Sequence, residues 1–341
     1  MVKTYKEAGV DIDAGEQAVG RIKAAVRSTY TPNVLSDVGQ FGGFFSFPKD
    51  EYDEPVLVSS TDGVGTKLKL AFRTGIHDTI GQDLVNHCVN DILTSGAIPL
   101  FFLDYIGLGK MEEDIVADVV KGLSSACREN GCALIGGELA EMVDFYHPGE
   151  YDIAGTVVGA VERKHIINGE RIAEGDVAIG LASTGLHTNG FTLARKVLLE
   201  QYDVNDQVDI LPDTVGRELL SIHKSYLQEV KPLIGDPRLK GISHITGGGL
   251  LGNTARIIPD GLQLRVDWNS WDVPAIFTLI QETGEIPDTE MRRTFNLGIG
   301  LVILVPASES ETMLAHFDRY QSNPTIIGEI AADSGSGKSV R

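Results

Sequence analysis

The residues best suited to chemistry lie in a short glycine-rich segment, residues 61–67 (TDGVGTK). Glycines let the backbone approach a ligand closely and point N–H groups at an anion. Asp62 offers carboxylate oxygens to a hard cation, and Lys67 offers a positive charge to a phosphate. An ordinary Asp-Gly turn is the alternative interpretation of the same residues. The segment therefore predicts either an anion and metal site or a plain turn.

A second polar group follows on a predicted helix at residues 77–95. Asp83, His87, Asn90 and Asp91 recur at spacings of three and four, which places them on adjoining faces of the helix. Such a stripe among apolar neighbours is either a metal-binding face or the solvent side. Taken alone, the pattern favours the solvent side.

Two further acids, Glu138 and Glu141, follow the predicted strand at residues 132–135, and they converge if this segment is helical. In mixed α/β folds, the ends of the strands gather ligands at one edge of the sheet. Carboxylates, waters and phosphate oxygens form the usual environment of Mg²⁺. We therefore predict that acids from these segments bind Mg²⁺, namely Asp62, Asp91, Glu138 and Glu141.

Two loops in the second half, residues 183–190 (STGLHTNG) and 244–249 (HITGGG), each join a predicted strand to a helix. A helix N-terminus presents backbone N–H groups to an anion. Turn glycines and capping hydroxyls are the alternative explanation, but two such loops in one half weaken it. Of the two histidines, His244 beside three glycines is the stronger functional candidate.

Strands and helices alternate around these motifs. In the first half, apolar runs predict strands at residues 55–60, 99–104, 132–135 and 151–161, with helices at 77–95 and 112–130. In the second half, we expect strands at 177–182, 261–266 and 298–305, and helices at 190–200, 218–233 and after 249. A connector-like segment near Asn168, followed by a turn into a new strand, predicts two domains, 1–168 and 169–341. The polar tail at 333–339 is expected to fray.

Composition excludes several classes of function. The 341 residues carry a formal net charge of −19, which disfavours a nucleic-acid partner. No apolar run approaches the ~20 residues that cross a bilayer, and three sparse cysteines suggest a reducing compartment, so we expect the cytoplasm. Dinucleotide and zinc motifs are absent from the sequence, and the Walker-like GKS at 337–339 lacks its first glycine and a following helix.

The motifs in their order resemble those of the phosphoribosylformylglycinamidine cyclo-ligase family, also called aminoimidazole ribonucleotide synthetases. The resemblance runs from Tyr5 to about Ile330, and the opening run at 5–15 (YKEAGVDIDAG) is specific to this family. The TDGVGTK and HITGGG motifs are shared more loosely with formylglycinamidine synthase, selenophosphate synthetase and thiamine-monophosphate kinase. Leu139 and Leu186 depart from the family pattern, which usually has threonine and proline there.

The resemblance implies a two-domain mixed α/β fold, in which N-terminal sheets of a homodimer pair into a barrel. It implies ATP-dependent ring closure of formylglycinamidine ribonucleotide, with release of ADP and phosphate, in purine biosynthesis. His244 would transfer a proton, and Lys67, with Lys23 as a second candidate, would neutralise phosphate. The remaining implied residues bind ATP (Asp62, Gly63, Gly65, Thr66, Lys67, Asn90) or substrate (His187, Asn189, Gly190, Thr246, Gly247, Gly248, Gly249).

Other members of the same superfamily are the nearest alternative, and a non-catalytic nucleotide sensor or structural dimer is a different class. The run at 5–15 argues against the first, because thiamine-monophosphate kinase and selenophosphate synthetase lack it. Retention of Asp62, Asp91 and Glu138 argues against the second, because a degenerate paralogue is expected to lose some of these acids.

Overall fold

The computed structural model describes residues 3–333, and the chain divides into two compact units. Unit 1 holds the described residues up to Ile92 together with Ala97–Glu162, and unit 2 holds Leu93–Gly96 and the residues from Arg163 on. The predicted boundary at Asn168 falls inside unit 2. The end of the tail at 334–341, with its GKS sequence, lies outside the described residues.

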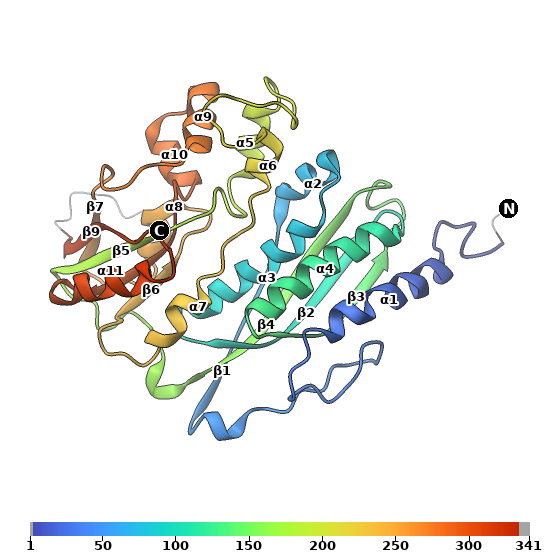
Figure 1. The fold of residues 1–341 in the computed structure, drawn as a ribbon, viewed down its shortest axis with the longest axis horizontal. Helices are drawn as coiled ribbons and strands as arrows, with labels where there is room; N and C mark the ends of the chain where they lie inside the picture. The colour runs from blue at the N-terminus through green and yellow to red at the C-terminus, as the bar shows by residue number, and fades with distance from the viewer. Residues whose placement is uncertain (1–2, 334–341) are drawn as a thin grey trace. The chain divides into compact units, whose positions relative to one another are not determined.

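Unit 1 is built on a four-stranded sheet in the order β1-β4-β2-β3 (Figure 1). The strands are β1 (Pro55–Gly63), β2 (Ile98–Leu108), β3 (Ala133–Glu141) and β4 (Tyr151–Glu162). Strand β4 pairs antiparallel with both β1 and β2, whereas β2 and β3 are parallel and are joined through a helix. The carboxyl ends of β1, β2 and β3 therefore lie at one edge of the sheet, as the metal prediction required.

Helices cover one face of this sheet. They are α3 (Asp78–Leu93) and α4 (Glu113–Glu129), with α1 (Ile12–Arg27) packed beside α4 and the short α2 (Leu68–Thr74) following β1 (Figure 1). Glycines bring α3 and α4 together, because a Cβ at Gly81 would overlap the backbone of Val119, and one at Gly122 would overlap that of Asp78. The other face remains partly open, and on it Leu57 is 63% exposed.

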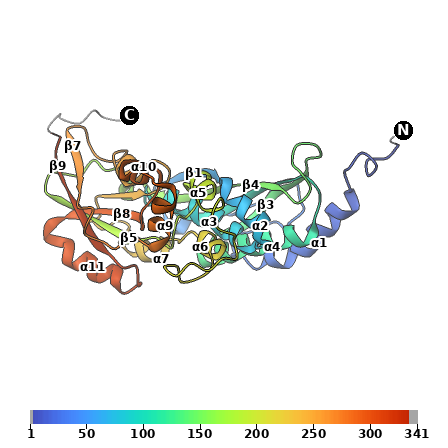
Figure 2. The same ribbon diagram turned by 90° about the horizontal axis from the view of Figure 1, so that it is seen from above.

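Unit 2 is built on an antiparallel sheet in the order β6-β8-β5-β9-β7. Its strands are β5 (Asp176–Ala182), β6 (Gly241–His244), β7 (Leu262–Val266), β8 (Ile299–Pro306) and β9 (Thr325–Ala332). Residues 299–305 of β8 are all buried, so both faces of this central strand are covered. Figure 2 shows α11 (Ser310–Asp318) along the sheet, where it contacts β5. The core also includes Ile245, which follows β6, and Leu250, which lies in the first turn of α8 (Gly249–Thr254).

The second half contains the main errors of prediction. The helix expected at 218–233 is wrong: α6 (Val215–Leu219) ends early, an irregular segment follows, and only α7 (Leu227–Val230) and a 3₁₀ turn (Lys231–Leu233) come after it. Sequence patterns also did not reveal α1, α9 (Ala275–Gly284), α10 (Asp288–Thr294), α11 or β9. Several of these are short elements whose period is hard to recognise. The helix expected at 190–200 corresponds to α5 (Phe191–Leu198), and the strand expected before the HITGGG loop is β6.

Within residues 3–333, no helix is both long enough and apolar enough to pass through a membrane. Cys88, Cys127 and Cys132 are all buried and unbridged.

Candidate functional site

The first candidate site in unit 1 centres on Asp62, at the end of β1. Its Oδ1 accepts a hydrogen bond from the N–H of Gly63 at 2.7 Å, and its Oδ2 lies 2.7 Å from Nε2 of His87 on α3. Burial lowers the pKa of His87, but the bond to Asp62 and the nearby carboxylates outweigh burial and leave that pKa raised. Burial by itself raises the pKa of Asp62. The hydrogen bond and the charge of His87 act in the opposite direction, and the pKa of Asp62 is lowered overall. The geometry therefore favours a carboxylate beside an imidazolium.

Asp91 faces the same imidazole. Its Oδ2 lies 3.9 Å from Nε2 of His87 and accepts a hydrogen bond from Oγ of Ser60 at 2.9 Å. The side chains of Asp62 and Asp91 are 44% and 30% exposed, so solvent reaches both carboxylates. Two carboxylates and a hydroxyl are hard oxygen donors of the kind that Mg²⁺ prefers. These residues fit the predicted metal.

The polar stripe on α3 does not face solvent, and that interpretation is wrong. Asp83 and Asn90 are fully buried, and His87 is nearly so. The Nζ of Lys67 lies 2.9 Å and 2.8 Å from the two carboxylate oxygens of Asp83, and both side chains are fully buried. Burial lowers the pKa of Lys67, while Asp83 acts in the opposite direction. The lysine thus lies in the core of unit 1, whereas Gly65 and Thr66 beside it are exposed.

The two glutamates do not converge, because β3 continues through them as a strand. Residues three apart on a strand point to opposite faces, so the expected helical pairing of Glu138 with Glu141 is wrong. Glu141 instead accepts hydrogen bonds from the N–H of Asp11 at 2.8 Å and of Met111 at 2.7 Å, which ties two loops together. Glu138 is exposed, as is Lys23 on α1.

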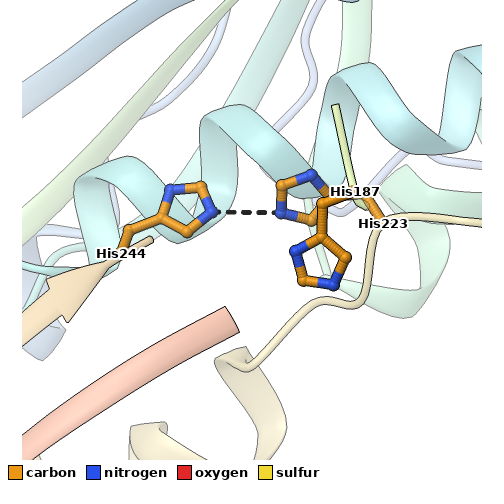
Figure 3. Close-up of side chains that lie close together, drawn as sticks. All are labelled: His187, His223 and His244. Carbon is orange, nitrogen blue, oxygen red and sulfur yellow. Dashed lines mark hydrogen bonds between the residues drawn. The ribbon is translucent and has the colours of Figure 1, made fainter. Parts of the chain in front are cut away.

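The second candidate site is a cluster of three buried histidines in unit 2 (Figure 3). Nε2 of His223 lies 3.0 Å from Nε2 of His244, and the rings of His187 and His223 stack with centroids 4.0 Å apart. Nδ1 of His223 is 3.4 Å from Oγ1 of Thr188. Ring nitrogens of all three lie within 4.8 Å of one another. Nε2 of His187 also accepts a hydrogen bond from the N–H of Thr184 at 3.3 Å, so ring nitrogens of all three histidines have hydrogen-bond contacts.

Local backbone features hold this cluster in place. His187 has a left-handed φ of 61°, which is uncommon for a residue with a side chain. Gly300 leaves room for the ring, because a Cβ there would lie 2.5 Å from Cε1 of His187 and would overlap the hydroxyl of Tyr226. That hydroxyl donates to the carbonyl of Ala182 at 2.9 Å. The rings are therefore fixed by β8 and by the end of β5.

The two predicted substrate loops lie side by side. Oδ1 of Asn189 is 3.3 Å from where a Cβ of Gly247 would stand. Asn253 clamps the glycine turn, since its amide donates to the carbonyls of Thr246, Gly247 and Gly249 at 3.2, 3.3 and 2.8 Å. Gly248 and Gly249 have positive φ, and a Cβ at Gly190 would overlap the ring of Phe295. The predicted residues of this half are thus brought together.

Sequence reasoning missed three members of these sites: His223, Asn253 and Ser60. His223 stands in the segment that was assigned to a helix, where a lone histidine carries no signal. Asn253 lies seven residues after Thr246, inside the helix that follows the glycines, and its capping chemistry was the available clue. Ser60 lies two residues before Asp62 on β1, so the two side chains share one face of the strand.

Comparison with known proteins gives a consistent result. The sequence profile described as "AIR synthase related protein, N-terminal domain" matches residues 50–161, and the corresponding C-terminal domain profile matches residues 173–340. A protein of Citrifermentans bemidjiense named phosphoribosylformylglycinamidine cyclo-ligase is 52% identical over 97% of this chain and 96% of its own length. A protein of the same name from Alkaliphilus metalliredigens is 47% identical over 97% and 96%.

Solved structures share the fold at much lower identity. Thiamine-monophosphate kinase from Stenotrophomonas maltophilia is 18% identical, with a TM-score of 0.69 over 93% of this chain and 94% of that one. The hydrogenase maturation protein HypE in complex with ATP is 17% identical, with a TM-score of 0.66 over 95% and 88%. A thiamine-monophosphate kinase complexed with AMPPCP and TMP is 16% identical, with a TM-score of 0.57 over 82% and 81%. These likenesses show the fold, while the relatives at half identity show that the chain belongs to the AIR synthase related family and, within it, to the phosphoribosylformylglycinamidine cyclo-ligases.

Proposed function

We propose that this chain catalyses the ATP-dependent ring closure of formylglycinamidine ribonucleotide to aminoimidazole ribonucleotide, with release of ADP and phosphate, as a step of purine biosynthesis. The observation that carries the proposal is membership of the cyclo-ligase family over nearly the whole chain. The paired acids of unit 1 and the histidine cluster of unit 2 supply groups that such a reaction needs.

ATP solves a leaving-group problem in this reaction. The formyl oxygen leaves poorly as it stands, and phosphorylation converts it into phosphate, which leaves readily. Two proteins of the same fold were solved with ATP or an ATP analogue, which supports nucleotide use here. We assign the binding of Mg²⁺ to Asp62 and Asp91, with Ser60 orienting the second carboxylate. When bound, the metal would supply positive charge to the phosphate groups.

The histidine cluster suits the proton transfer that follows. Attack of the amidine nitrogen on the activated carbon releases protons, and a neutral imidazole accepts one near neutral pH. The 3.0 Å contact between Nε2 of His223 and Nε2 of His244 needs one N–H and one lone pair, so these two nitrogens do not both carry a proton. We assign proton acceptance to His244 and orientation of its ring to His223.

The adjacent loops suit a phosphorylated substrate. His187, Asn189 and Gly190 stand on one loop and Thr246–Gly249 on the other, and Asn253 holds the second in shape. Fixing both reacting groups of one molecule replaces a bimolecular encounter and is worth up to roughly 7–11 kcal/mol of the barrier. Rigid loops therefore serve the ring closure directly.

Lys23 on α1 is our candidate for neutralising phosphate, because it is exposed, whereas Lys67 is buried against Asp83. A homodimer is also part of the proposal. It is supported by the partly open face of the unit 1 sheet, on which Leu57 is largely exposed. Three buried and unbridged cysteines support a cytoplasmic location.

The test is a coupled assay with formylglycinamidine ribonucleotide, ATP and Mg²⁺, which follows ADP release and the diazotisable amine product. We expect equal amounts of ADP and amine. Asp62→Asn should lower kcat at least a hundredfold, in the range of lost electrostatic stabilisation. Glu311→Gln, on the exposed side of α11, is the matched control and should leave turnover unchanged.

His244→Asn tests the assigned proton acceptor in the same assay. We expect a roughly 10²–10⁴-fold loss, as for other general bases. Full activity in this variant would remove His244 from the mechanism. Absence of both products with folded wild-type protein would refute the cyclo-ligase function itself.

A further inference from the structure

His223 lies in the segment of residues 221–226, which joins α6 to α7 and forms neither helix nor strand. Its ring is nevertheless fully buried, and its Nε2 is 3.0 Å from Nε2 of His244, the contact drawn as a dashed line in Figure 3. A segment outside helices and sheets needs other contacts to hold one side chain so closely. The residues on either side of His223 make such contacts.

Lys224, the next residue, contacts a buried acid and a serine. Its Nζ lies 3.4 Å from Oε1 of Glu229 and donates a hydrogen bond to Oγ of Ser322 at 3.3 Å. Oγ of Ser322 donates in turn to Oε2 of Glu229, so the three side chains form a closed triangle of contacts. The side chains of Lys224 and Glu229 are 22% and 4% exposed. Solvent and salt therefore screen this ion pair only weakly.

The charge of Glu229 depends on these two partners. Burial is the main cause of the raised pKa of Glu229, and the hydrogen bond from Ser322 and the charge of Lys224 act against that rise. Both partners therefore favour the ionised carboxylate. The ionised carboxylate is also the form that attracts the ammonium of Lys224 most strongly.

The triangle is joined to the sheet of unit 2 at the end of β5. The carbonyl of Ser322 accepts a hydrogen bond from the N–H of Ala182, the last residue of β5, at 3.0 Å. The carbonyl of Ala182 accepts one from the hydroxyl of Tyr226 at 2.9 Å, and Nζ of Lys224 lies 5.0 Å from the centre of the Tyr226 ring. Strand β5 is the middle strand of its sheet. Lys224 is thus tied to a rigid element.

A different contact holds the chain on the other side of His223. Oγ1 of Thr184 donates a hydrogen bond to the carbonyl of Ile222, and Oγ1 of Thr188 lies 3.4 Å from Nδ1 of His223 itself. The backbone is therefore held before His223 through Ile222 and after it through Lys224. Loss of the second tie leaves the segment free to pivot about the first.

We propose that Lys224 is a positioning residue, which holds His223 against His244 through its contacts with Glu229 and Ser322. The kinetic part of this inference rests on the proposed function, in which His223 orients the ring of His244. Without the ammonium, the segment loses its tie to β5 and Nε2 of His223 moves away from Nε2 of His244. His244 then meets the proton that it accepts in a less favourable orientation.

The first test is kinetic and uses the coupled assay. Lys224→Met should lower kcat by roughly tenfold to a hundredfold, the range for a misplaced catalytic group, and keep the KM for ATP within about twofold of wild type. Lys224→Arg should recover kcat to within about threefold, because a guanidinium also donates to a carboxylate and a hydroxyl. Ser322→Ala removes one corner of the triangle and should lower kcat by roughly threefold to tenfold.

Lys240 provides a matched control in the same unit. Its Nζ lies 2.7 Å and 2.8 Å from the carboxylate oxygens of Asp176, and the two side chains are 18% and 6% exposed. Asp176 is the first residue of β5, at the opposite end of the strand from Ala182. Lys240→Met therefore breaks an ion pair of comparable burial far along the strand. It should lower the melting temperature, as Lys224→Met does, and leave kcat and KM as in wild type.

Nuclear magnetic resonance gives a readout that does not depend on turnover. The proton between the two Nε2 atoms should give a downfield N–H signal in full-length protein that carries nitrogen-15-labelled histidine. His223→Gln assigns this signal by removing it. Lys224→Met should lose the signal, whereas Lys240→Met should keep it. If Lys224→Met does not fold, the same spectrum of Ser322→Ala decides, and it should show a weakened signal.

The outcomes separate the positioning role from the proposed function. An unchanged signal in folded Lys224→Met would overturn the positioning role, and so would an equal loss of kcat in Lys224→Met and Lys240→Met, because lowered stability would then explain both. If wild type forms no amine product, the proposed function is refuted. Loss of the signal in Lys224→Met alone would still support the positioning of His223.

Discussion

At the scale of single residues, burial changes what a charged side chain does. Lys67 follows the glycine-rich segment and was expected to face a phosphate, but its ammonium is enclosed with Asp83. Removing both ions from water is costly, and their mutual attraction offsets that cost only while both are present. Loss of one partner from a buried ion pair of this kind strongly destabilises the folded protein.

Lys67→Met should therefore lower the free energy of unfolding by about 3–5 kcal/mol, because Asp83 is left buried without a counter-charge. The double variant Lys67→Met, Asp83→Leu should recover most of this loss, as measured by urea unfolding. A purely structural role also predicts that the double variant keeps the wild-type KM for ATP. A large rise in that KM in a stable double variant would restore Lys67 to the phosphate site.

A second residue-scale effect concerns His77, whose Nδ1 lies 3.1 Å from the hydroxyl of Tyr151. Burial lowers the pKa of His77, although Asp118, Glu112 and Asp78 act against it. The unfolded chain therefore binds the proton more readily than the folded one. The stability contributed by neutral His77 is present above its ordinary pKa of 6.5 and is lost as the pH falls towards the lowered folded value.

We expect the free energy of unfolding to fall between pH 7 and pH 5, and His77→Gln to flatten that slope. Chemical denaturation at several pH values measures this directly. Replacement of His147, an exposed histidine, serves as the comparison and should leave the slope as in wild type. An identical slope in His77→Gln would show that other groups cause the acid sensitivity.

At the scale of elements, close approach between helices depends on glycine. The backbones of α3 and α4 meet at Gly81 and Gly122, where a Cβ has no space. This contact seats α3 against the sheet and so positions His87 and Asp91 beside Asp62. Helix propensity alone would favour alanine at both glycines, so packing has overridden it.

Gly81→Ala should destabilise unit 1 by roughly 1–3 kcal/mol, since backbone atoms must move apart. The matched control is Gly20→Ala on α1, where a Cβ meets nothing within 4 Å. That change should stabilise by up to ~1 kcal/mol through helix propensity. Thermal unfolding of the two variants should shift in opposite directions, and equal shifts would contradict the packing argument.

At the scale of the whole molecule, each unit has its own sheet and core, and the unit 1 sheet keeps one face partly open. On this face, Leu57 is 63% exposed, and the hydroxyls of Thr61 and Thr156 bond to each other at 2.8 Å across β1 and β4. Exposed apolar surface on a sheet favours burial against another surface. A second copy of the chain is the partner in our proposal.

Leu57→Lys should convert the expected dimer to monomer at micromolar concentration, because a charge would be buried at the interface. Sedimentation equilibrium measures the mass, and the monomer should keep its secondary structure. Ile210→Lys, at an exposed apolar residue of unit 2, is the control and should remain dimeric. A wild-type protein that is monomeric at all concentrations would remove the dimer from the proposal.

The sequence alone determined the family, the mixed α/β class and most strands of both halves, because motifs and apolar runs are local patterns. It also put forward Asp62, Asp91, His187 and His244 as candidate site residues by residue type. Only the tertiary structure decided which partners they meet: His87 between the two acids, and His223 beside His244. Burial of Lys67 was likewise invisible, because desolvation depends on residues that are distant in the chain.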